Sequence, residues 1–138
     1  MRKIILFCLI FLLVGCSDSP KSKADKLIDT YLKENLKDPS SYECIKKGNL
    51  GLYTPMTIAI EKESEKISKG EAISDTMDVF LDHVKKYFIK NGTNPYDTLA
   101  WELSIKYRAK NTYGGYEISN CIFYFDKGIS HIINVENK

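Results

Sequence analysis

The stretch Trp101-Glu102-Leu103-Ser104-Ile105-Lys106-Tyr107-Arg108-Ala109-Lys110 decides the fold class of this chain, because apolar and polar residues alternate along it without interruption. Alternation with a period of two residues is typical of a β-strand that buries one face and exposes the other. Strands of antiparallel sheets commonly have this pattern, since one side of the sheet packs on a core while the other contacts water. The sequence therefore predicts a half-buried strand of an antiparallel sheet here.

Two further strands are expected after this one. Gly114-Gly115 predicts a turn, and residues 116–125 then form a strand with Cys121, Phe123 and Phe125 on one face. Its first half does not alternate cleanly, which predicts a bulge there. Asp126-Lys127-Gly128 is typical of a hairpin turn, and the residues from 129 to 135 alternate again. The last third of the chain thus predicts three consecutive antiparallel strands.

Upstream of these strands, apolar residues recur at helical spacing in three segments separated by turn residues. The expected helices cover residues 22–37, 54–69 and 74–91, and a strand covers residues 41–52. Ser22 and Asp25 resemble a capping box at the start of the first helix, and Asp38-Pro39 is expected to end it. The second helix begins at Thr54-Pro55, and Asn91-Gly92 ends the third.

The resulting element order is α-β-α-α-β-β-β. It predicts an α+β fold with the helices packed on one face of a three- to four-stranded antiparallel sheet. The chain has 138 residues, 43% of them hydrophobic, which is enough for one core and too few for two. We therefore expect a single domain over residues 23–138, preceded by a polar tether over residues 16–22.

The first sixteen residues carry an export signature. Arg2-Lys3 precedes eleven uninterrupted apolar residues, 4–14. A membrane-spanning helix needs roughly 20 apolar residues, so this run is too short to cross a bilayer and instead fits the apolar region of a secretory signal peptide. The run ends in Leu13-Val14-Gly15-Cys16, which resembles the lipobox of bacterial lipoproteins. The alternatives are an ordinary signal peptide with a chance cysteine, or a buried N-terminal helix.

The lipobox resemblance implies that diacylglycerol alkylates the thiol of Cys16, that a signal peptidase removes residues 1–15, and that the new amino group is acylated. Each buried CH₂ of a lipid chain contributes about 0.8 kcal/mol, and two or more chains anchor a protein stably. In enteric members of this family, Asp after the cysteine tends to retain the protein in the inner membrane. Ser17 stands there instead. The resemblance therefore favours a lipid-anchored protein of the cell envelope, on the outer membrane facing the periplasm.

Two cysteines remain in the mature chain, Cys44 and Cys121. A pair of cysteines in an exported protein favours a disulfide, which would close a loop of roughly 77 residues and stabilise the fold by about 4 kcal/mol. The alternative is two buried free thiols. The sequence contains no Cys-x-x-Cys, so it indicates neither a redox-active pair nor a zinc knuckle.

The charge of the mature chain argues against a nucleic-acid partner. Arg2 and Lys3 account for the whole excess of 20 basic over 18 acidic residues, so removal of residues 1–15 leaves a net charge of zero. Nucleic-acid binders need an excess of Lys and Arg to displace counterions from phosphates. We therefore expect no nucleic acid among its partners.

No motif of catalysis or metal binding stands out. His83 and His131 lack a second ligand at metal-binding spacing, and the stripe of Asp75, Asp78 and Asp82 is typical of a solvated helix face. The sequence has no Gly-x-Ser-x-Gly and no phosphate-binding glycine loop. We therefore expect that the protein is not an enzyme and that it binds no cofactor, no metal and no small-molecule substrate.

One pair of motifs stands above the background. Leu36 to Ser41 matches "Leu-x-Asp-Pro-x-Ser", and Lys110 to Gly115 matches "Lys-Asn-x-aromatic-Gly-Gly". Together they resemble a group of small uncharacterised exported bacterial proteins, over residues 24–138, from which no activity can be transferred. The functional interpretation makes a recognition patch of four side chains: Arg108, Lys110, Asn111 and Tyr113. The alternative interpretation is a long hairpin whose residues serve only the turn.

These observations favour a non-enzymatic binding or structural module that contacts the membrane through its lipid and an envelope protein through its surface. The expected contact surface is the strand face bearing Lys106, Arg108 and Lys110, or the helices within residues 55–91. The alternative is an inhibitor or immunity-type lipoprotein that neutralises an exported toxin or hydrolase.

Overall fold

The structure, a computed structural model, describes residues 18–71 and 76–138. The lipobox with Cys16 and the predicted starts of the tether and of the third helix lie outside these residues. The described elements follow the order α1 (Pro20–Asn35), β1 (Asp38–Lys47), β2 (Gly51–Tyr53), α2 (Pro55–Ser68), α3 (Met77–Lys90), β3 (Ala100–Lys110), β4 (Tyr116–Phe125) and β5 (Ile132–Asn137). The predicted α+β class and element order are confirmed, with the expected strand over residues 41–52 divided into β1 and β2.

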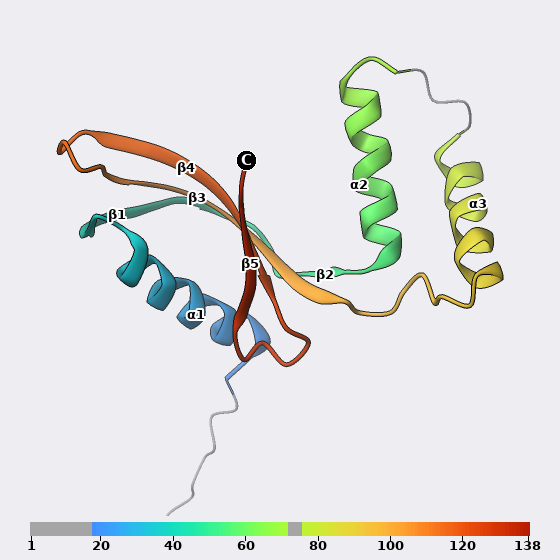
Figure 1. Ribbon diagram of the computed structural model, residues 1–138, viewed down its shortest axis with the longest axis horizontal. Coiled ribbons are helices and arrows are strands. Elements are labelled where there is room, and N and C mark those ends of the chain that lie inside the picture. The colour runs from blue at the N-terminus through green and yellow to red at the C-terminus, as the bar shows by residue number, and fades with distance from the viewer. Residues whose placement is uncertain (1–17, 72–75) are drawn as a thin grey trace, which may run out of the picture.

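Strand β3 is the centre of the sheet (Figure 1). It pairs along one edge with β1 and then β2, and along the other edge with β4, whose far side pairs with β5; all pairings are antiparallel. The β3–β4 register runs in step from Trp101 opposite Phe125 to Lys110 opposite Tyr116, so the bulge predicted in the first half of β4 is absent. Register shifts occur instead in the β1–β3 pairing, between Asp38 and Glu43 and between Cys44 and Lys46, and in the β4–β5 pairing, between Tyr124 and Phe125.

The division between β1 and β2 has a local cause. The backbone N–H of Gly48 donates to the carbonyl oxygen of Ser104 at 2.8 Å, and Gly51 lies opposite Glu102. Asn49 and Leu50, which lie between these glycines, therefore face a single residue of β3, Leu103. The extra residue interrupts the hydrogen-bond ladder, as in a β-bulge. The single strand predicted over residues 41–52 thus forms two strands that follow each other along the same edge of β3.

Helix α1 begins earlier than predicted. Its N-cap is Ser19, whose hydroxyl accepts a hydrogen bond from the N–H of Ser22 at 3.2 Å, and Pro20 occupies the first turn. Proline is favoured at this position because its fixed φ suits a helix and its missing N–H is not needed there. The predicted tether over residues 16–22 is consequently shorter. Four residue steps separate Cys16 from Pro20, a reach of at most about 14 Å.

Among the helices that the structure describes, only α1 packs on the broad face of the sheet. It buries Ala24, Ile28 and Leu32 against the apolar face of β3 and β4, which contains Leu103, Ile105, Tyr107, Ala109, Cys121, Phe123 and Phe125. The ring of Tyr31 meets Phe123 edge-on, with centroids 5.4 Å apart. The alternation predicted from the sequence therefore matches the buried face of β3.

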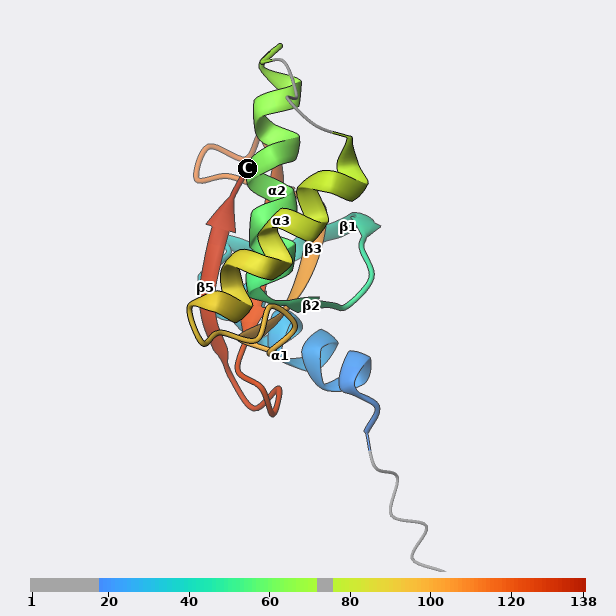
Figure 2. The ribbon, with the colours of Figure 1, turned by 90° about the vertical axis from the view of Figure 1, so that its right-hand side faces the viewer.

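Helices α2 and α3 lie next to each other beyond the end of the sheet where β2 lies (Figures 1 and 2). Helix α2 begins at a capping box between Thr54 and Thr57, and it buries Pro55 and Met56 near β2. Helix α3 buries no residue. The expectation that the helices share one face of the sheet therefore holds for α1, whereas α2 and α3 form a separate projecting pair. No helix within the described ranges is both long and apolar enough to cross a membrane.

The two faces of β4 give a direct test of this core. Phe123 is fully buried beneath α1, whereas Ile118 is 62% exposed on the other side of the same strand. Phe123→Ala should lower the free energy of unfolding by about 3–5 kcal/mol, because it leaves a cavity in the core. Ile118→Ala should change it by about 0.5 kcal/mol or less. Urea unfolding followed by circular dichroism measures both, and equal losses would contradict the assignment of faces.

Candidate functional site

The face of the sheet opposite α1, here called the outer face, carries the polar residues of β3. Its β3 members are Glu102, Ser104, Lys106, Arg108 and Lys110. Two regions of this face concentrate functional groups. One is the free end of the β3–β4 hairpin, which contains the recognition patch predicted from the sequence. The other is a pocket at the opposite end, near α2.

At the hairpin end the structure brings Arg108 and Lys110 together around one ring. The guanidinium carbon of Arg108 lies 5.2 Å from the ring centroid of Tyr116, and the ammonium of Lys110 lies 5.7 Å from it. Arg108 also donates to Oε2 of Glu43 from Nε at 2.8 Å and forms an ion pair through Nη2 at 2.6 Å. Ion pairs this exposed contribute at most about 1 kcal/mol, so the pair orients Arg108 more than it stabilises the fold.

The other two predicted patch residues have different roles. Oδ1 of Asn111 accepts hydrogen bonds from the backbone N–H groups of Tyr113 at 3.0 Å and Gly115 at 3.1 Å. Gly114, at φ +80°, provides the left-handed conformation that this turn requires. Asn111 therefore serves the turn, as the hairpin interpretation predicts. Tyr113 is 95% exposed at the tip of the hairpin and remains free to contact a partner.

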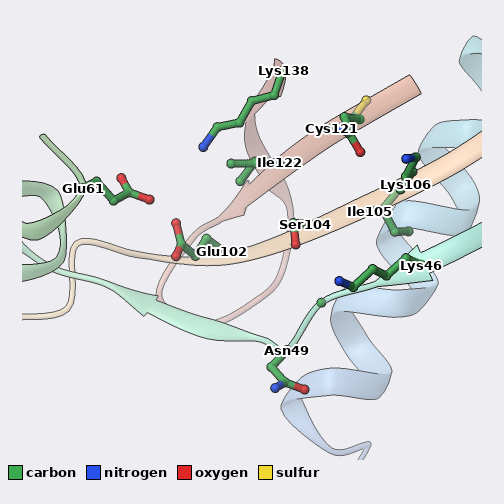
Figure 3. Close-up of a pocket in the computed structure, with 12 residues that line it drawn as sticks. Lys46, Asn49, Glu61, Glu102, Ser104, Ile105, Lys106, Cys121, Ile122 and Lys138 are labelled. Atoms are coloured by element: carbon green, nitrogen blue, oxygen red, sulfur yellow. The ribbon is translucent and has the colours of Figure 1, made fainter. Parts of the chain in front are cut away.

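The pocket lies on the outer face between the sheet and α2 (Figure 3). It has a volume of about 540 Å³. Residues from five separate segments line it: Lys46, Gly48 and Asn49 at the junction of β1 and β2; Glu61 on α2; Glu102, Ser104, Ile105 and Lys106 on β3; Asn120, Cys121 and Ile122 on β4; and Lys138 after β5. A volume of this size is typical of small-molecule sites.

Gly48 sets the shape of one wall. A Cβ atom at this position would overlap Oγ of Ser104, closer than real Cβ contacts allow. The absence of a side chain at Gly48 therefore lets its backbone lie directly against β3 beside the hydroxyl of Ser104. Asn49 follows at the bulge and borders the pocket from the same side (Figure 3).

Five charged side chains surround the pocket: Lys46, Glu61, Glu102, Lys106 and Lys138. Within residues 18–71 and 76–138, none of the five forms an ion pair, although lysines elsewhere in the fold pair with carboxylates at 2.6–3.2 Å. Lys46 lies directly opposite Lys106 in the β1–β3 register, and like charges in this position repel. The pocket therefore gathers charged groups that form no ion pair with one another, although Lys138 acts electrostatically on Glu102.

Glu102 is the most constrained of these groups. Its Oε2 atom is buried and accepts no hydrogen bond from any described residue. Burial raises the pKa of Glu102 above its ordinary value, and the neighbouring carboxylates of Glu61 and Glu136 raise it further against the opposing effect of Lys138. Glu136 itself accepts a hydrogen bond from the hydroxyl of Tyr124 at 3.3 Å. The α2 end of the pocket is thus rich in negative charge.

The two cysteines are not joined in the structure. Both are free; Cys44 is exposed and Cys121 is buried. Strand β3 lies between β1 and β4, so the backbones that carry the two thiols are about 10 Å apart across the sheet, and a disulfide requires Cα atoms within about 7 Å. The thiol of Cys121 instead lies 3.0 Å from Oδ1 of Asn137, and burial raises its pKa. The disulfide expected from the sequence would need a rearrangement of the sheet.

The remaining groups considered in the sequence lie apart from the pocket. His131 belongs to the β4–β5 turn, where its Nδ1 is 3.4 Å from Oδ1 of Asp126, and His83 lies on α3. Asp82 pairs with Lys86 at 2.6 Å on the exposed side of α3, and Asp75 lies outside the described residues. Among described residues, no group of three or more His, Cys, Asp or Glu side chains could hold a metal ion.

No protein-family model, curated protein or solved structure matches this chain. The function of the candidate site therefore has to be inferred from the geometry of its residues. Sequence reasoning identified the outer face through Lys106, Arg108 and Lys110 but missed the pocket. Glu61 lies in a stretch where glutamates alternate with Lys62, Ser64 and Lys66, a pattern typical of a solvated surface. Nothing in the local pattern indicates that Glu61 lies near Glu102.

The raised pKa of Glu102 predicts how stability depends on pH. The folded protein binds the proton of the Glu102 carboxyl more tightly than the unfolded chain does. The contribution of Glu102 to stability is therefore fully present below its pKa in the unfolded chain. It is lost as the pH rises through its raised pKa in the folded protein. Glu102→Gln mimics the protonated side chain. It should match the wild type near pH 4 and exceed it by about 1 kcal/mol near pH 8, since it removes a buried charge without a partner.

Urea unfolding of both proteins over this pH range measures the difference. Because all other titrating groups are shared, their contributions cancel in the comparison. A difference that stays constant with pH, or a variant that is less stable at high pH, would contradict the environment described for Glu102.

Proposed function

We propose that this chain is a lipid-anchored protein of a bacterial cell envelope that acts by binding rather than by catalysis. The export signature and the lipobox Leu13-Val14-Gly15-Cys16 support the anchor. The early start of α1 at Pro20 supports close contact with the bilayer, because the chain between the anchor and the domain reaches at most about 14 Å. The proposed location is the outer membrane, on its periplasmic side.

The observation that carries the binding role is Glu102, whose buried Oε2 accepts no hydrogen bond from any described residue and which lines the pocket together with four exposed charged side chains, Lys46, Glu61, Lys106 and Lys138. A partly buried charge without a partner is unfavourable, so such groups are retained where a ligand or solvent satisfies them. A concave site with convergent polar groups and a carboxyl group of perturbed pKa is the pattern expected of a binding site. The pocket fits that pattern.

The hydrogen bonds around the pocket favour binding over catalysis. Nucleophilic catalysis requires a nucleophile within hydrogen-bond reach of a base that a third group orients. Among the described lining residues, neither the hydroxyl of Ser104 nor the ammonium groups of the three lysines bond to a histidine or a carboxylate. The proposal therefore assigns these groups to ligand contact.

A second candidate function is the inhibitor or immunity-type role, in which the protein neutralises an exported toxin or hydrolase. The surface at the hairpin end favours it. Tyr113, Tyr116 and Ile118 are exposed there beside Arg108. Aromatic residues and arginine are enriched among the residues that dominate protein–protein binding energy. This surface fits a protein partner, whereas the pocket fits a small ligand.

The anchor is tested by mass spectrometry of the protein purified from the membrane fraction. The mature N-terminal peptide should begin at Cys16 and carry the mass of a diacylglycerol thioether, with or without a further acyl chain. Cys16→Ala should abolish the lipid, because the modification requires sulfur, and should leave residues 1–15 attached. Recovery of the wild-type protein in the soluble fraction with residues 1–15 and an unmodified Cys16 would contradict the proposal.

The binding role is tested by site-specific photo-crosslinking in the producing cell. A photoreactive residue at Asn120 samples the pocket, one at Tyr113 samples the hairpin tip, and one at Lys33 on α1 is the control. A reproducible small adduct at 120 is expected from the first function. A protein adduct confined to 113 would support the second. Adducts no more frequent at 120 or 113 than at 33 would contradict both.

A further inference from the structure

The charges around the pocket are arranged in two groups of opposite sign. Glu61 and Glu102 lie toward one another at the α2 end, whereas Lys46 and Lys106 lie at the other end (Figure 3). Lys46 and Lys106 face each other across β1 and β3, and Glu61 acts electrostatically on Glu102. The fifth charged side chain, Lys138, lies beside Glu61 and acts electrostatically on Glu102, so the acidic end holds two carboxylates and one ammonium, whereas the basic end holds two ammonium groups (Figure 3).

The separation of the two ends follows from the strand that carries both. Glu102 and Lys106 are four residues apart on the same face of β3, which corresponds to about 13 Å along the strand. At this separation the two groups do not form a direct ion pair. The side chains can lean inward, so the charges of a ligand need to be less far apart than the backbone positions are.

We propose that this pocket binds a zwitterion, a short peptide of two or three residues with both termini free. This inference rests on the proposed binding function and names its ligand class. The peptide ammonium lies at the Glu61–Glu102 end, and the peptide carboxylate lies at the Lys46–Lys106 end. Ser104 and Asn120, which also line the pocket, bond the peptide groups.

Charge complementarity supports each end of this assignment. An ammonium has three donors and would pair with the carboxylates of Glu61 and Glu102 at the acidic end. A carboxylate accepts from ammonium groups through short, charge-assisted hydrogen bonds, and placed between Lys46 and Lys106 it would relieve their repulsion. A purely anionic ligand would leave Glu102 without a donor, and a purely cationic one would leave the two lysines without an acceptor.

The size of the pocket supports a peptide over smaller zwitterions. An extended chain spans about 3.3–3.6 Å per residue, so two or three residues separate the terminal charges by roughly 7–11 Å. The volume of about 540 Å³ accommodates a ligand of this size. Phosphoethanolamine, the headgroup of a common membrane lipid, has the same pair of charges but only two carbon atoms between them, so it is a suitable competitor in a test.

The test is a calorimetric titration of the full mature protein in detergent micelles with trialanine, N-acetyltrialanine, trialanine amide and phosphoethanolamine. Trialanine should bind saturably with one molecule per protein. Each blocked peptide should bind about tenfold more weakly, since it loses a charge-assisted contact at one end. Equal binding of blocked and free peptides, no binding of trialanine, or tighter binding of phosphoethanolamine would each overturn the proposal.

Matched variants assign the two ends. Glu102→Gln should abolish the preference for a free amino group and keep the preference for a free carboxylate. Lys106→Gln should do the reverse, and Lys46→Gln provides the same test if the Lys106 variant is unstable. The control is Lys33→Gln, because Lys33 lies on α1, on the opposite side of the sheet from the pocket. Loss of both preferences in the control would overturn the assignment.

The titration tests the proposed ligand class, whereas the crosslinking tests the proposed binding function. If trialanine does not bind while the photoreactive residue at Asn120 forms a reproducible adduct in cells, the ligand class is wrong and the binding function stands. If neither occurs, both proposals fail. If trialanine binds with the expected preferences, it should also reduce crosslinking at 120 when added to isolated membranes, and crosslinking that persists unchanged would overturn the pocket as its site.

Discussion

The structure depends on the two faces of strand β3. Leu103 and Ile105 are fully or almost fully buried, whereas their neighbours Ser104 and Lys106 lie on the outer face. Because side chains alternate strictly along a strand, a shift of one residue would place every charge of β3 in the core. Burial beneath α1 therefore fixes the register of β3, and that register in turn positions β1, β2 and β4 on either side of it. The display of charged groups on the outer face is a consequence of how the core is built.

The pocket forms where neighbouring elements cover one part of the outer face and leave the rest open. Helix α1 occupies the opposite side, and α2 and α3 project beyond the end of the sheet, so only part of the outer face is enclosed (Figure 1). At that place α2 contributes Glu61, the β1–β2 junction contributes Lys46 and Asn49, and Lys138 borders the pocket after β5. The hairpin end stays open and contains the aromatic and basic residues that suit a protein partner. Two kinds of surface thus share one face, at opposite ends of β3.

The sequence predicts those parts of the fold that depend on local periodicity. The alternation of β3, the strands that follow it and the capping residue Thr54 of α2 are all recognisable without a structure. Features that depend on pairing between distant strands are not recognisable in the sequence. The separation of Cys44 from Cys121 by β3, and the placing of Lys46 opposite Lys106, come from strand order and register. The start of α1 at Pro20 was missed because Ser19 and Ser22 are both acceptable caps, and the proline decides between them.

The most direct test of the central role of β3 is amide hydrogen exchange on the folded protein, resolved by residue. Strand β3 is paired on both edges and its apolar face is buried beneath α1. If these contacts hold the domain together, the amides of residues 103–109 should be among the slowest to exchange. They should open only with global unfolding. The amides of α3, which buries no residue, should exchange through local opening at a much lower free energy. Exchange in β3 as fast as in α3, or protection centred on α2 and α3, would contradict the account.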